Sequence, residues 1–256
     1  MSTMPVPAPD AQAAPLSQGA RIVNTFVAPS KTFNDLNRSA SWWAPWLLSC
    51  VCALIFCYSI GQYVGWDQIS RNSIAQNPKR AEQIDKLPPD QKAKQLQIAA
   101  TATKYFSYAI PLIVVIAFLI MASILMATFN LALGAGVPFR VSLAIVAYGG
   151  LPGIIGSLLA TISVVVGGMS GSLDPAAFDI RNPVATNLSY FMDPMGNKFA
   201  YGMASALDVF VIWSIILMGI GFACNSKVKK GTAIGVVAGW YIFYKLLGAG
   251  LAAAFS

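Results

Sequence analysis

The chain has 256 residues, of which 56% are hydrophobic and only 11% are charged. An ordinary soluble domain carries about 25% charged residues, so these charges are too few to cover a water-exposed surface. The formal net charge of +7 is spread over several loops without a basic-aromatic motif, which indicates contact with lipid headgroups and excludes nucleic acid as an expected partner.

The N-terminal 40 residues divide into two parts. Residues 1–20 are rich in Pro, Ala and Gln and lack apolar periodicity, which predicts a disordered polar tail. In residues 21–40, the side chains of Ile22, Val23, Phe26 and Val27 share one face at helical spacing. We therefore expect residues 21–40 to form an amphipathic lead-in at the membrane surface, with a soluble linker as the alternative.

Residues 41–256 contain five long apolar segments. A helix of about 20 apolar residues crosses the ~30 Å hydrocarbon layer of a bilayer. The segments predict an all-α, polytopic integral membrane protein whose five transmembrane helices lie at about 45–65, 106–131, 141–166, 200–224 and 232–255. In the third span, Pro152 removes a backbone hydrogen bond, which predicts a kink. Polar segments at 67–104 and 167–202 separate the spans.

Small residues recur at helical spacing in two of these spans. They are Gly149, Gly153 and Ser157 in the third span and Gly231, Gly235 and Gly239 in the fifth. Such tracks let another helix backbone approach closely. We expect the fifth-span track to pack against a neighbouring span, with homodimerisation as the alternative.

Two charged residues, Asp208 and Lys245, fall inside predicted spans. An isolated charge there costs on the order of 3 kcal/mol. Counted from the turn near Val228, the two residues lie at depths that differ by only ~5 Å at 1.5 Å per residue. We expect them to form an ion pair or to share a polar pocket. Separate snorkelling and an ion pathway are the alternatives.

No residue pattern indicates catalysis. The chain has no histidine, which removes the commonest general base and metal ligand. The four cysteines, Cys50, Cys52, Cys57 and Cys224, form no CxxC pair and lie in apolar surroundings. Nucleophile–base pairs, phosphate-binding loops and intramembrane-protease motifs are absent as well. We expect neither an enzyme nor any metal or other cofactor.

Positive charge gives a weak indication of orientation. The N-terminal side of the predicted topology has seven basic residues and the other side has nine. The seven lie close to span ends, and Lys227, Lys229 and Lys230 crowd one short turn, whereas the nine are spread over two long loops. We therefore expect a multi-pass protein of the cell membrane with a cytoplasmic N-terminus.

Several segments together resemble a known family. They are VAPSKTFNDLNRSASWWAPWLL before and into the first span, AYGGLPGIIGSLL in the third, and ALDVFVIWSIILMGIGFACNSKVKKGTAIGVVAGWYIF across the last two. Over about residues 21–250 the chain resembles the bacterial branch of the Yip domain family, the Ypt-interacting protein family. Its most specific part is Leu207, Asp208, Phe210 and Trp213, followed by a glycine and a basic turn.

The resemblance implies a five-helix, non-enzymatic membrane protein with a cytoplasmic N-terminus. Eukaryotic members associate with small prenylated GTPases and with one another. The DLYGP-type motif that precedes the first span in those members is absent, because Asp35-Leu36-Asn37 matches only its first two residues. We therefore expect the bilayer, other membrane proteins or a second copy as partners, and not a small GTPase.

Two functions compete at this point. The first is a Yip-type protein that organises membrane or protein partners. The second is a small ion or solute transporter or channel that uses an Asp208/Lys245 pocket. The odd number of spans and the lack of a visible internal repeat favour the first, because transporters are commonly built from inverted repeats.

Overall fold

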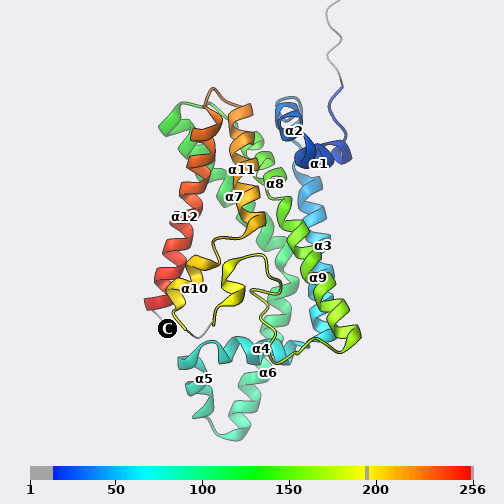
Figure 1. Ribbon diagram of the computed structural model, residues 1–256, viewed down its shortest axis with the longest axis vertical. Helices are drawn as coiled ribbons and strands as arrows, with labels where there is room; N and C mark the ends of the chain where they lie inside the picture. The colour runs from blue at the N-terminus through cyan, green and yellow to red at the C-terminus, as the bar shows by residue number, and fades with distance from the viewer. Residues whose placement is uncertain (1–13, 194–195, 255–256) are drawn as a thin grey trace, which may run out of the picture.

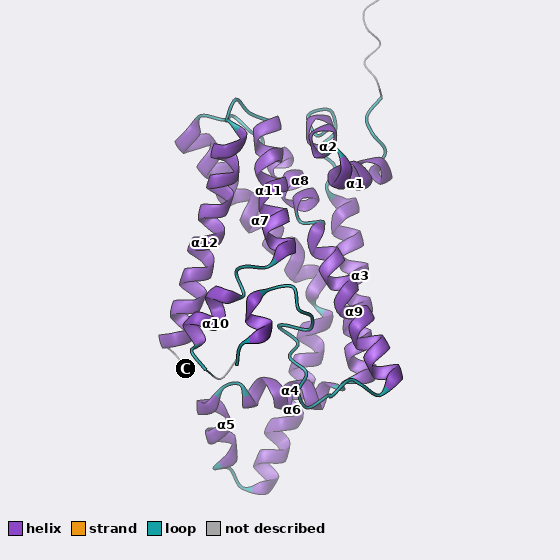
Figure 2. Ribbon diagram, viewed as in Figure 1, coloured by secondary structure: helices purple, strands orange, loops and turns teal. Residues whose placement is uncertain are grey.

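The computed structural model describes residues 14–193 and 196–254, which contain helices and loops but no strand (Figures 1 and 2). Most of the predicted disordered tail, residues 1–13, lies outside the described residues. The first helix, α1 (Gln18–Val27), begins three residues earlier than the predicted lead-in. Its start is set by Ser17, whose side chain accepts a hydrogen bond from the backbone N–H of Ala20, as helix caps do.

Four helical segments of the described chain are long and apolar enough to cross a membrane. They are α3 (Trp43–Tyr63), α7 (Ile110–Ala127) with the π-helical turn η1 (Thr128–Ala132), α8 (Phe139–Gly149) with α9 (Pro152–Ser170), and α12 (Lys230–Ala254). A fifth span results if α10 (Lys198–Ala204) and α11 (Val209–Cys224), which are bent by 55°, count as one. The chain is therefore an all-α polytopic membrane protein.

Helix α8 lies at the centre of the bundle. Every residue from Val141 to Gly149 is buried, as expected for a helix that is apolar on all sides. Helices α7 and α11 pack on it. The ring of Phe129, in the turn η1 that follows α7, stacks on Phe222 of α11 with the centroids 4.2 Å apart. Since aromatic pairs are worth about 0.5–1.5 kcal/mol beyond their buried area, this stack helps to fix η1 against α11.

The lead-in forms a helical pair, α1 and α2 (Pro29–Asp35), at the upper end of the bundle (Figure 1). Phe33 of α2 and Leu36 are completely buried in the main core, whereas Val23 and Val27 of α1 are exposed. The buried Arg21 guanidinium binds the buried Asp35 carboxylate, with Nη2 at 2.7 Å and Nε at 2.8 Å from Oδ2. The lead-in is thus anchored in the protein and also presents apolar side chains outward.

At the opposite end lie three polar helices, α4 (Trp66–Ala75), α5 (Pro78–Asp85) and α6 (Pro89–Tyr108) (Figure 1). Asn77 caps α5 by accepting a hydrogen bond from the backbone N–H of Arg80, and Pro78 occupies the first helical position. This agrees with the preference for proline where the N–H has no helical partner. Helix α6 passes into α7 after a single residue, Ala109.

Two spans are interrupted. In the third, α8 ends at Gly149 and Pro152 is the first residue of α9, a position that tolerates the missing N–H of proline. In the fourth, residues 205–208 separate α10 from α11. The long loop between α9 and α10 contains the short helix η2 (Leu188–Phe191) and fills the space beside this second break (Figure 1).

Candidate functional site

A cavity of about 900 Å³ lies beside the break between α10 and α11. Its walls come from α4, the α9–α10 loop, α10, α11 and α12. The charged residues that line it are Arg181, Lys198, Asp208 and Lys245. The volume falls in the range of about 300–1,000 Å³ that is usual for small-molecule sites.

Asp208 lies at the break and caps α11. Its Oδ1 accepts hydrogen bonds from the backbone N–H groups of Phe210 at 2.9 Å and Val211 at 3.1 Å. Its Oδ2 accepts a hydrogen bond from the hydroxyl of Thr186 at 2.5 Å. A carboxylate in this position satisfies otherwise unpaired N–H groups and interacts favourably with the helix dipole.

Lys245 reaches the same cavity from α12. Its ammonium donates a hydrogen bond to Ser205 Oγ at 3.2 Å and lies 5.7 Å from the centre of the Tyr241 ring. Ser205 belongs to the break between α10 and α11, so the lysine connects α12 to that break.

Asp208 and Lys245 therefore line the same polar cavity but do not form the predicted ion pair. Within the described part of the chain, no nitrogen–oxygen contact of 4.0 Å or less joins the two residues. The physical reason is the break in the fourth span. It places Asp208 before the first turn of α11, where the helix N–H groups take the place of an ammonium partner.

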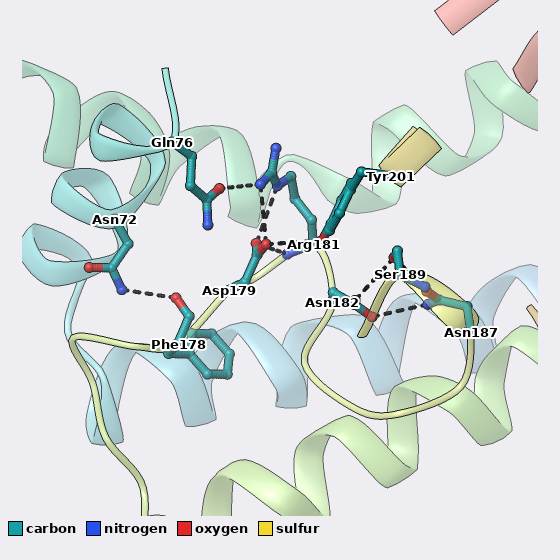
Figure 3. A network of polar contacts seen from close by, with 9 residues as sticks. All are labelled: Asn72, Gln76, Phe178, Asp179, Arg181, Asn182, Asn187, Ser189 and Tyr201. Carbon is teal, nitrogen blue, oxygen red and sulfur yellow. Dashed lines mark hydrogen bonds and ion pairs between the residues drawn. The ribbon is translucent and has the colours of Figure 1, made fainter. Parts of the chain in front are cut away.

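Figure 3 shows a polar network, and five of its residues also line the cavity: Gln76, Arg181, Asn187, Ser189 and Tyr201. The side-chain amide of Asn72 in α4 donates hydrogen bonds to the carbonyl oxygens of Pro175 and Phe178. Arg181 forms an ion pair with Asp179 at 3.1 Å and donates a hydrogen bond to Gln76. These contacts fix the α9–α10 loop on α4.

A second part of the network orders the loop near η2 (Figure 3). Asn182 donates a hydrogen bond to Ser189 Oγ at 3.2 Å and accepts one from Asn187 at 3.0 Å. Ser189, which is buried, donates in turn to Asn187 Oδ1. The loop segment beside the cavity is thus held by side-chain hydrogen bonds.

Most of the residues that line the cavity have polar side chains. Within residues 14–193 and 196–254, no three Cys, Asp or Glu side chains come together in a group that could hold a metal ion. Apart from one carboxylate, the polar side chains that line the cavity are amides, hydroxyls and cations. That carboxylate, Asp208, caps α11. Such a lining suits binding of a polar or anionic group.

The small-residue track of the fifth span lies on an open face of α12. A methyl group built on Gly231, Gly235 or Gly239 would have no atom within 4 Å. The expected packing of this track against a neighbouring span is therefore corrected. Helix α12 instead turns Ala233, Val237 and other residues toward the bundle.

The close helix contacts depend on other glycines. A Cβ on Gly219 of α11 would lie 2.6 Å from the Cα of Ile234 in α12, and one on Gly202 of α10 would lie 2.9 Å from the Cβ of Ala249. In the third span, a Cβ on Gly149 would lie 2.5 Å from Met218 Cγ, whereas Gly153 has no atom within that 4 Å range. Ser157 is partly exposed.

Sequence reasoning missed most of the cavity. Lys198, Tyr201 and Ser205 fall in or beside the predicted span 200–224, and Gln76 and Arg181 fall in the polar segments 67–104 and 167–202. The one signal for the break was Asp208 itself, because Asp immediately before an apolar run is a typical helix cap. It was outweighed by the continuous hydrophobicity of residues 200–224.

A comparison with protein-family models identifies the family. The model described as Yip1 domain matches residues 23–251. Comparisons with curated proteins and with solved structures find no match. The matched range begins in α1 and ends in α12, so it includes the cavity and the open glycine face. The chain therefore belongs to the Yip1 domain family.

Proposed function

We propose that this chain is a non-enzymatic integral membrane protein that organises membrane or protein partners. The observation that carries the proposal is the open face of α12, where a Cβ built on Gly231, Gly235 or Gly239 would meet no other part of the described chain within 4 Å. Close approach of another membrane helix would bury this face. The partner helix comes from another membrane protein or from a second copy of this chain.

The contrast with the other glycines supports a partner at this face. Gly219 and Gly202 lie against neighbouring helices of the same chain, so their lack of a side chain is already explained by packing. Gly231, Gly235 and Gly239 have no such explanation. Gly235 and Gly239 lie in the interior of α12, where glycine costs roughly 0.5–1 kcal/mol relative to alanine. Small residues spaced by four are typical of helix–helix interfaces in membranes.

We further propose that the protein resides in the cell membrane with its N-terminus in the cytoplasm. The lysines of the turn before α12, Lys227, Lys229 and Lys230, support this orientation because positive charge close to span ends favours the cytoplasmic side. Single cysteines at Ser17 and Ala177, in a background without the native cysteines, test it. A membrane-impermeant maleimide added to intact cells should label position 177 and not position 17.

The bonding of Asp208 favours the organising role over the transporter alternative. Both oxygens of Asp208 accept hydrogen bonds from α11 and Thr186, so this carboxylate acts as a fixed cap rather than as an exchangeable ion ligand.

Affinity capture from native membranes tests the organising role. The wild-type chain should retain a membrane protein or a second, differently tagged copy. Gly235→Ile, which places a bulky side chain on the open face, should lose it while still eluting as a folded protein in detergent. Ile216→Val, a mild change on an exposed position of α11, serves as the control. Equal capture by wild type and Gly235→Ile would count against this surface.

A further inference from the structure

We propose that the cavity beside α10 and α12 binds an anionic phosphate group, and that Lys198 and Lys245 hold it. Both lysines line the cavity, one from the start of α10 and one from the fifth span. None of Gly231, Gly235 and Gly239 lines it, so the proposal is independent of the partner surface on α12.

The two lysines have donor capacity to spare. Among the described residues, the Lys198 ammonium has no hydrogen bond or ion pair, and the Lys245 ammonium has a single hydrogen bond, to Ser205. An ammonium group has three N–H donors. Hydrogen bonds from an ammonium to a phosphate oxygen are about twice as strong as those between neutral groups, so an anion at this place satisfies both cations.

The carboxylates near the cavity are already used. Asp208 accepts hydrogen bonds from the N–H groups of α11 and from Thr186, and Asp179 pairs with Arg181. Neither carboxylate forms an ion pair with Lys198 or Lys245. Among the described residues, neither Lys198 nor Lys245 is therefore in direct contact with a carboxylate.

The position of the cavity indicates where a phosphate would come from. Lys245, Gly248 and Ala249 belong to a candidate membrane span, whereas Gln76 and Arg181 belong to the polar helices and loop outside it. The cavity thus lies between a candidate membrane span and the polar helices and loop of the protein. Tyr244, which also lines the cavity, is 66% exposed on the surface of α12. The same phosphate chemistry is offered there by a free phosphate from water and by the headgroup of an anionic phospholipid.

The test uses the full chain purified in a neutral detergent. Inorganic phosphate is titrated and followed by calorimetry and by the thermal midpoint, because a ligand that binds only the folded state raises that midpoint. In parallel, the protein is incubated with mixed micelles of phosphatidylglycerol and phosphatidylcholine in equal amounts, and retained lipids are counted by native mass spectrometry. Phosphate binding identifies a free phosphate as the source, and enrichment of phosphatidylglycerol identifies a lipid headgroup.

Lys198→Gln and Lys245→Gln remove the charge and keep a side chain that donates hydrogen bonds, although glutamine is one atom shorter than lysine. Each substitution should weaken binding of the probe that binds the wild type, inorganic phosphate or phosphatidylglycerol, about tenfold. This is the effect expected for loss of one charge-assisted hydrogen bond. Lys198→Arg, which keeps the positive charge, should retain most of the binding. Lys79→Gln, on exposed α5 and outside the cavity lining, is the matched control and should bind like wild type.

Lys198 lies at the first position of a short, partly exposed helix, so Lys198→Gln keeps the test valid even if Lys245→Gln unfolds. The proposal is overturned if neither probe binds the wild type. It is overturned equally if Lys198→Gln and Lys79→Gln bind as tightly as the wild type.

Discussion

The sharpest prediction concerns Gly219 in α11. The Cβ of an alanine at this position would lie 2.6 Å from the Cα and 2.8 Å from the backbone nitrogen of Ile234 in α12. Because these are backbone atoms, the clash is relieved only if one helix moves. Overpacking of this kind costs roughly 1–3 kcal/mol, against a gain of roughly 0.5–1 kcal/mol from the better helix propensity of alanine. We expect Gly219→Ala to lose about 1–2 kcal/mol of stability.

Gly235→Ala is the matched control, because the same change is made in an adjacent helix where no atom lies within 4 Å. In the purified, detergent-solubilised monomer it should gain about 0.5–1 kcal/mol. Thermal unfolding followed by tryptophan fluorescence measures both variants. For a chain of this size, 1 kcal/mol corresponds to roughly 2–4 °C in the midpoint, so the two variants should move in opposite directions. If Gly219→Ala melts at or above Gly235→Ala, α11 and α12 do not pack at the described distance.

Three further predictions concern the polar contacts. Asp35→Asn leaves the buried Arg21 without its counter-charge and should cost about 3–5 kcal/mol, whereas replacing both residues by Met and Leu should recover most of the loss in a denaturation series. Asp208→Ala should cost about 1 kcal/mol through the lost cap, and a cycle with Lys245→Met should be additive within ~0.5 kcal/mol; strong coupling would reveal a direct ion pair. Asn72→Ala should speed proteolytic cleavage within residues 173–180, and unchanged cleavage would show that α4 does not hold this loop.

Hydropathy was sufficient to predict the fold class. Each candidate span coincides with an apolar segment, because a helix that crosses a bilayer must be apolar over most of its length. Helix starts with strong local signals, such as Asn77-Pro78 at the start of α5, agree with the capping preferences of their residues as well. These features depend on residues close together in the chain, which is why the sequence reveals them.

The contacts between distant segments were not predictable in this way. No local pattern joins Arg21 to Asp35, because each residue also suits a solvated surface. Helical spacing placed Gly231, Gly235 and Gly239 on one track, but it cannot say whether that track faces the bundle. The break at residues 205–208 was hidden because averaging over a window of apolar residues conceals four residues that leave the helix.

Site-specific photo-crosslinking in native membranes tests the proposed organising role most directly. A photoreactive side chain at position 235 lies on the open face of α12, and one at position 237 replaces the buried Val237 and serves as the control. The proposal predicts a crosslinked adduct to a second polypeptide from position 235 and none from position 237. Crosslinks from position 235 to lipid alone would contradict it.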